Sequence, residues 1–158
     1  MKLLPKIIVN DIKINYQIRG EGEPLILIHG GSGSSMHWLY QVPELSKHYR
    51  VIVYDVRGHG KTDKPKQEYS IELFSEDLSE LMNKLEIDKA HIIGHSLGGM
   101  IAQQFALNFP NRILSLVLTS TLCNISKRFE TLLDNWILIA GKTRYGSYIF
   151  SICYMVNK

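Results

Sequence analysis

The sequence has little cysteine and lacks the usual patterns of cofactor and metal sites. Its two cysteines, Cys123 and Cys153, lie far apart, with no histidine near either. This spacing excludes a disulfide framework and a zinc site of the common types. The dinucleotide pattern G-x-G-x-x-G and the phosphate-loop pattern G-x-x-x-x-G-K are absent as well. We therefore expect neither a metal nor a cofactor.

Long apolar runs and a strong charge are also missing. The longest apolar run near the end, residues 148–156, contains a serine and is about half of the ~20 residues that a membrane span needs. Residues 1–6 lack the apolar core of a signal peptide. The net charge is only +3, and the basic stretch 61–66 is interrupted by Asp63. These features predict a cytoplasmic protein with no nucleic acid or membrane partner.

The sequence does contain alternating strand and helix patterns. Residues 12–18 alternate apolar and polar side chains and predict a half-exposed strand, paired as a hairpin with residues 6–9. Unbroken apolar runs predict buried parallel strands at 25–28, 51–54, 91–93 and 113–118. Helices are predicted at 35–46, at 71–85 with Ser70 as N-cap, and at 100–109. The pattern indicates an α/β fold with a mostly parallel, doubly wound sheet and an antiparallel N-terminal hairpin.

Gly94-His95-Ser96-Leu97-Gly98-Gly99 is the strongest motif, because it lies between a predicted buried strand and a predicted helix. In this setting G-x-S-x-G forms a sharp turn that exposes the serine above the sheet. The motif predicts Ser96 as a nucleophile and the Leu97 N–H as a donor to an oxyanion. The alternative is a glycine-rich turn with an inert serine, and the strand-turn-helix context favours the nucleophile.

Two further motifs follow predicted strands. His29-Gly30-Gly31-Ser32-Gly33 frees backbone amides, and the Gly31 N–H is the candidate second oxyanion donor; a phosphate cradle or a plain tight turn are the alternatives. In the segment 55–60, Arg57 and Asp55 are expected to tie the loop together. A catalytic role for His59 is the less favoured interpretation.

Together, HGG, DxRGHG and GHSLGG on successive strand ends resemble the α/β-hydrolase superfamily, in particular small esterases and enol-lactonases, over residues 6–121. The resemblance implies a Ser–His–acid triad whose acid and histidine come late in the chain, and a helical cap inserted after the sixth strand. Residues 1–121 would then be the N-terminal part of the core and 122–158 the start of the cap, with the fold truncated after the sixth strand. Dehalogenases and epoxide hydrolases of this superfamily carry aspartate where Ser96 stands.

The implied triad partners of Ser96 are absent from the sequence. No histidine follows residue 95, and residues 119–121, where some relatives place the acid, read Thr-Ser-Thr. Asp134 falls in the expected cap. We therefore expect the triad histidine and acid to lie outside this chain and the 158 residues to be inactive alone. His29 is an alternative local base, although it is more simply explained by a hydrogen bond in its own loop, and His95 is expected to pack beside the elbow.

The function that this resemblance implies is hydrolysis of a small ester or lactone through an acyl-enzyme on Ser96. Two alternatives remain open. The same serine could serve C–C bond hydrolysis or perhydrolysis, or the fold could be a non-catalytic ligand-binding or signalling module.

Overall fold

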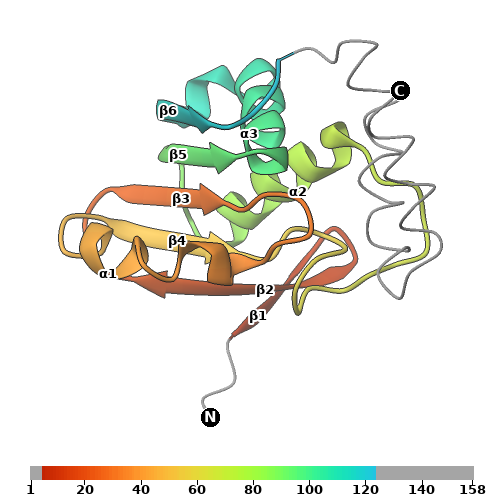
Figure 1. Cartoon of the computed structure of the whole chain (residues 1–158), viewed down its shortest axis with the longest axis horizontal. Helices are drawn as coiled ribbons and strands as arrows, with labels where there is room; N and C mark the ends of the chain where they lie inside the picture. The colour runs from red at the N-terminus through yellow and green to blue at the C-terminus, as the bar shows by residue number, and fades with distance from the viewer. Residues whose placement is uncertain (1–4, 124–158) are drawn as a thin grey trace.

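The computed structural model describes residues 5–123, so the predicted cap lies outside the described residues except for 122 and 123. The described chain forms one six-stranded sheet in the order β1-β2-β4-β3-β5-β6 (Figure 1). The strands are β1 (Lys6–Val9), β2 (Ile12–Arg19), β3 (Pro24–Ile28), β4 (Arg50–Tyr54), β5 (Ala90–His95) and β6 (Ile113–Thr119). Strands β1 and β2 form the predicted antiparallel hairpin, β2 pairs antiparallel with β4, and the remaining pairs are parallel.

Helices cover both faces of the sheet. The helices are η1 (Ser35–Trp38), α1 (Val42–Leu45), α2 (Ile71–Lys84), α3 (Leu97–Asn108) and η2 (Pro110–Arg112). Side chains of α2 and α3 join the larger core cluster on one face, whereas Trp38 of η1 and Val42 of α1 join a smaller cluster on the other face. Each fully buried aliphatic or aromatic side chain contributes about 1.5–3 kcal/mol, so the α2–α3 face dominates stability. Among the described residues, no helix is long and apolar enough to cross a membrane.

Two helix predictions were wrong in extent. The single helix predicted at 35–46 is divided into η1 and α1. Pro43 lies in the first turn of α1, where its missing N–H costs nothing, whereas inside one continuous helix it would leave a backbone carbonyl without a donor. The helix predicted at 100–109 begins earlier, at Leu97, because Gly98 and Gly99 belong to its first turn. By contrast, the Ser70 N-cap is confirmed: its Oγ accepts from the Leu73 N–H at 3.1 Å.

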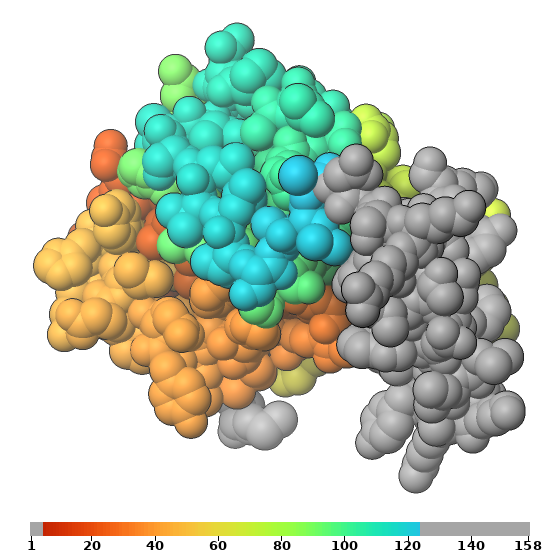
Figure 2. All heavy atoms as spheres, turned by 45° about the horizontal axis from the view of Figure 1, so that its top comes forward, coloured from red at the N-terminus to blue at the C-terminus, as the bar shows by residue number. Residues whose placement is uncertain are grey.

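Strand β6 differs from the other parallel strands. The apolar run of β6 predicted a strand covered on both faces, or an unpaired apolar edge where no further strand lies beside it. The described residues show the second case, because Leu114, Val117 and Leu118 are 43%, 46% and 41% exposed. Among the described residues β6 pairs only with β5, and Figure 2 shows the segment around β6 at the surface. An apolar edge strand of this kind is unusual, because unpaired strand edges promote association.

Candidate active site

Ser96 lies in the turn between β5 and α3 with φ 52° and ψ −115°. Such a backbone conformation is costly for a residue with a side chain and persists only where the surroundings enforce it. Here the end of β6 supplies that enforcement. The Ser96 N–H donates to the Thr119 carbonyl at 3.0 Å, and the Thr121 hydroxyl donates to the Ser96 carbonyl at 2.7 Å. The backbone of the predicted nucleophile is therefore held at both its amide and its carbonyl.

The glycines of this turn have little room for side chains. A Cβ on Gly94 would collide with the carbonyl oxygen of Gly98, and a Cβ on Gly98 would collide with that of Ile28. A Cβ on Gly99 would lie 2.5 Å from the Thr121 Cβ. Glycine at these positions therefore allows α3 to pack directly against the ends of β3, β5 and β6.

The glycine loop (residues 29–34) starts beside this turn, because Ile28 of β3 is in register with Gly94 of β5. A Cβ on Gly30 would lie only 3.2 Å from the Ser96 Cβ, so the loop packs against Ser96. Gly31, the predicted oxyanion donor, follows directly and is half-buried. Leu97 occupies the first turn of α3, where backbone amides have no intrahelical acceptor. The structure thus brings Ser96, Leu97 and the glycine loop to one edge of the sheet.

His29 is fully buried and both of its ring nitrogens are engaged. Nδ1 lies 2.7 Å from the Gly30 carbonyl oxygen, and Nε2 accepts from the Val56 N–H at 3.0 Å. The hydrogen bond predicted within its own loop is therefore present, and the alternative of His29 as the base for Ser96 lacks a free nitrogen. Burial lowers the pKa of His29 to about 4. The hydrogen bond to Gly30 acts in the opposite direction, and nearby His59 lowers the pKa slightly further. The ring is therefore neutral at pH 7.

His95 packs beside the turn, as predicted. Its Nδ1 lies 3.2 Å from the Thr119 hydroxyl, and its ring contacts that of His37 with centroids 4.6 Å apart. Burial and the neighbouring His37 lower the pKa of His95. The pair joins η1 to the end of β5, and so connects the segment after the glycine loop with the turn that carries Ser96.

Among residues 5–123, no histidine nitrogen is hydrogen-bonded to the Ser96 hydroxyl. His59 has Nδ1 at 2.9 Å from the Arg57 carbonyl oxygen, and His91, near the start of β5, has Nδ1 at 2.7 Å from the Ser115 hydroxyl. The described part of the chain therefore assembles a serine and candidate oxyanion donors without a hydrogen-bonded base.

Asp55, directly after β4, binds the loops around it. One carboxylate oxygen accepts from the Ser35 N–H at 2.7 Å, and the other from the Lys61 N–H at 2.8 Å and the Asn15 amide at 3.0 Å. Burial alone would raise the pKa of Asp55, but the N–H donors of Lys61 and Ser35 outweigh it and lower the pKa. The predicted tying role of Asp55 is present, and it extends to η1 beside the glycine loop.

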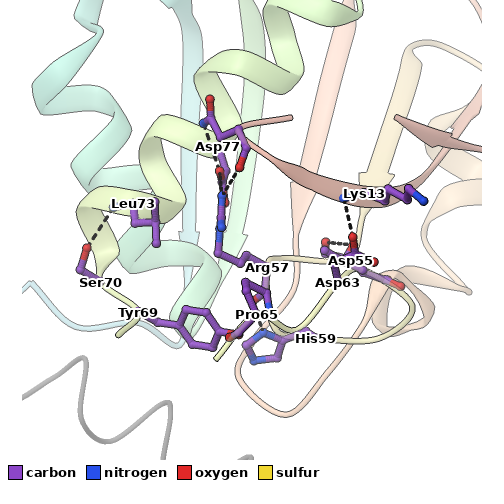
Figure 3. Close-up of polar contacts among 12 residues, drawn as sticks. Lys13, Asp55, Arg57, His59, Asp63, Pro65, Tyr69, Ser70, Leu73 and Asp77 are labelled. Atoms are coloured by element: carbon purple, nitrogen blue, oxygen red, sulfur yellow. Dashed lines mark hydrogen bonds and ion pairs between the residues drawn. The ribbon is translucent and has the colours of Figure 1, made fainter. Parts of the chain in front are cut away.

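Arg57 differs from its prediction, because its partner is not in its own loop. Its Nε and Nη2 each donate to a carboxylate oxygen of Asp77 on α2 at 2.6 Å (Figure 3). Both side chains are almost completely buried, and the Asn10 amide donates to the same carboxylate at 3.1 Å. The sequence contained a signal for this partner: Asp77 lies on the apolar face of its helix, one turn from both Phe74 and Leu81.

A family model described as alpha/beta hydrolase fold matches residues 23–147. The chain belongs to the α/β-hydrolase family. The α/β-hydrolase relatives include a 2-hydroxy-6-oxo-2,4-heptadienoate hydrolase of Pseudomonas putida, 35% identical over 116 residues, which cover 71% of this chain and 42% of that protein. The membership confirms the resemblance drawn from the three glycine-containing motifs.

Solved structures of other hydrolases have a fold similar to that of this chain. A meta-cleavage product hydrolase from Pseudomonas fluorescens is 37% identical with a TM-score of 0.74, over 79% of this chain and 47% of that one. An N-acyl homoserine lactone degrading enzyme is 31% identical with a TM-score of 0.77, over 87% of this chain and 55% of that one. The chain therefore spans about half the length of these structures and less than half of the Pseudomonas putida relative.

Proposed function

We propose that Ser96 is the nucleophile of a serine hydrolase that acts on a small ester or lactone. In this proposal, the Ser96 hydroxyl oxygen attacks the carbonyl carbon, and the N–H groups of Leu97 and Gly31 stabilise the oxyanion that forms. Collapse of this intermediate expels the alcohol and leaves an acyl-enzyme, which water hydrolyses. A histidine and an acid from outside the 158 residues would accept and return the proton, since no histidine follows Ser96.

The observation that carries this proposal is the backbone of Ser96. A serine with φ 52°, held by hydrogen bonds at its amide and its carbonyl, is a costly conformation of the kind found at functional sites. Ser96 lies between the end of β5 and the first turn of α3, which is the setting in which a G-x-S-x-G turn exposes its serine. The similarity to a lactone-degrading enzyme supports an ester or lactone as the substrate class.

A serine-reactive fluorophosphonate tests the assignment in the native full-length protein. Its phosphorus forms a bond to an activated serine oxygen while fluoride leaves, so we expect one adduct, found by mass spectrometry on the peptide containing Ser96. Ser96→Ala should abolish both the adduct and ester turnover. Ser120→Ala is the matched control, because Ser120 also follows a strand with a positive φ of 48°, and it should retain both.

Turnover that persists in Ser96→Ala would disprove the role of Ser96. Specific ligand binding without turnover, unchanged by that substitution, would instead indicate the non-catalytic binding or signalling module.

C–C bond hydrolysis is the second candidate, and the similarity to a meta-cleavage product hydrolase and to a 2-hydroxy-6-oxo-2,4-heptadienoate hydrolase favours it. The same serine and oxyanion donors would act on a vinylogous diketone, with a carbon rather than an alcohol as the leaving group. Rates on a phenyl ester, a lactone and a vinylogous diketone separate the two candidates, and a peroxide assay tests perhydrolysis. A diketone rate far above the ester and lactone rates would establish the second candidate.

A further inference from the structure

The carbonyl oxygen of Gly30 accepts two hydrogen bonds inside the glycine loop. The Gly33 N–H donates to it at 3.1 Å, and His29 Nδ1 lies 2.7 Å from it. His29 Nε2 accepts from the Val56 N–H at 3.0 Å, so Nε2 carries no proton. In a neutral imidazole the proton must then be on Nδ1, and His29 is a donor to Gly30. The Val56 amide therefore selects the tautomer that binds the loop.

The Gly30 carbonyl and the Gly31 N–H belong to one peptide group. That group is planar and trans, since the described chain contains no cis peptide bond. In a trans peptide the C=O and the N–H point in opposite directions. Two hydrogen bonds that fix the Gly30 carbonyl therefore also fix the direction of the Gly31 N–H.

We propose that His29 is a positioning residue, which orients the Gly31 N–H as an oxyanion donor through its hydrogen bond to the Gly30 carbonyl. This inference rests on the proposed function of Ser96. His29 touches neither the reacting atoms nor the Ser96 hydroxyl; it acts through the peptide between Gly30 and Gly31.

The surroundings of His29 keep this arrangement intact. Burial lowers its pKa to about 4, so the ring stays neutral and Nε2 remains an acceptor at pH 7. The other end of the glycine loop is also anchored, because Asp55 accepts from the Ser35 N–H at 2.7 Å. Asp55 and Val56 are neighbours after β4, and both ends of the loop are therefore fixed to the same strand end.

Two substitutions of His29 separate its two hydrogen bonds. Asparagine can place an N–H donor where Nδ1 stands, whereas glutamine can place an acceptor near Nε2 but removes the donor to Gly30. Losing one aligned oxyanion donor lowers kcat by about 100-fold or more, so we expect His29→Gln to lose about 100-fold in kcat with KM within about twofold. His29→Asn should recover most of that kcat.

The matched control is His59→Gln, a second buried histidine whose Nδ1 contacts the Arg57 carbonyl instead of the glycine loop. It should leave kcat near that of the wild type. Affinity for a boronic acid, which forms a tetrahedral adduct on the serine, should fall in parallel with kcat in His29→Gln. Equal kcat in the glutamine and asparagine variants, or a change in KM alone, would overturn the inference.

A readout independent of catalysis keeps the two proposals distinct. Turnover that does not depend on Ser96 would contradict the proposed function and not the placement of the His29 proton. Nitrogen-15 NMR of the wild-type protein at pH 7 reports that proton directly. We expect the proton on Nδ1, and a proton on Nε2 would overturn the inference even if a His29 variant failed to fold.

Discussion

At the scale of single residues, the site depends on glycines whose lack of a Cβ atom allows close packing. Gly98 leaves its Cα close enough to the Ile28 carbonyl oxygen that any Cβ would collide with it. Gly99 instead faces the Thr121 side chain, whose nearest atoms lie 2.5–2.7 Å from a Cβ position. A side chain moves more easily than the backbone of a buried strand, so the two glycines should respond differently to the same substitution.

We predict that Gly98→Ala destabilises the protein by about 2–3 kcal/mol, as overpacking of a core does. Gly99→Ala should cost less, because Thr121 can shift. Replacing glycine by alanine in a helix otherwise stabilises the protein by about 0.4–1 kcal/mol. A loss of stability in Gly98→Ala would therefore indicate a steric collision. Urea unfolding of both variants measures the difference. A Gly98→Ala protein as stable as the wild type would contradict the close approach of α3 to β3.

At the scale of elements, α2 is connected to the strand ends by a buried ion pair. Arg57 follows β4, Asp77 lies on α2, and Asn10 joins them from the turn between β1 and β2. Removing one partner leaves the other charge buried and unpaired, which is more costly than losing both. We therefore predict that this pair fixes the position of α2 against the sheet.

A double-mutant cycle tests this docking role. The single variants are Asp77→Leu and Arg57→Met. Asp77→Leu should destabilise the protein by about 3–5 kcal/mol, because the Arg57 guanidinium stays buried without its counter-charge. Arg57→Met with Asp77→Leu should recover a large part of that loss, since neither charge remains. Urea unfolding of the single and double variants gives the coupling energy. Additive effects would show that the two side chains act independently.

The sequence predicted most of these elements but not their cross-connections. Unbroken apolar runs located β3 to β5, and a serine cap located the start of α2. The position of Asp77 on the apolar face of its helix indicated a buried partner, but the Arg57–Asp77 pair escaped prediction because the two residues come from separate elements and no local pattern identifies Arg57 as that partner. The role of the Gly30 carbonyl depends on a tautomer set by Val56, another residue distant in sequence. The exposure of β6 depends on what lies beside the strand, which its own apolar pattern does not encode.

At the scale of the whole molecule, stability should depend on pH through histidines whose pKa is lowered in the folded protein. The pKa values of His29, His59 and His95 are all lowered, chiefly by burial. For His29 the pKa falls from 6.5 to about 4, so between these values the unfolded chain binds a proton that the folded chain does not. Stability from this group is complete above pH 6.5 and decreases as the pH falls towards 4.

We predict that acidification from pH 7 to pH 5 lowers the free energy of unfolding by about 2 kcal/mol through His29 alone. His59 and His95 act in the same direction. His29→Gln, which does not titrate, should lose less stability over the same interval, and the difference from the wild type isolates the contribution of His29. Urea unfolding at the two pH values provides the measurement, and identical losses in both proteins would contradict the lowered pKa.

The hydrogen bonds around Ser96 and the glycine loop also divide the site into two modules of contiguous chain. Residues from β3 to β4 and the loop after it contain the glycine loop and its anchors, and residues from β5 to β6 contain the strained serine and the threonines that hold it. The contacts that close each module join residues 20–27 positions apart. The modules meet where Ile28 lies beside Gly94. The alignment of the serine with the candidate oxyanion donors therefore depends on the register of this one strand pair, and a slip of β3 against β5 would separate them.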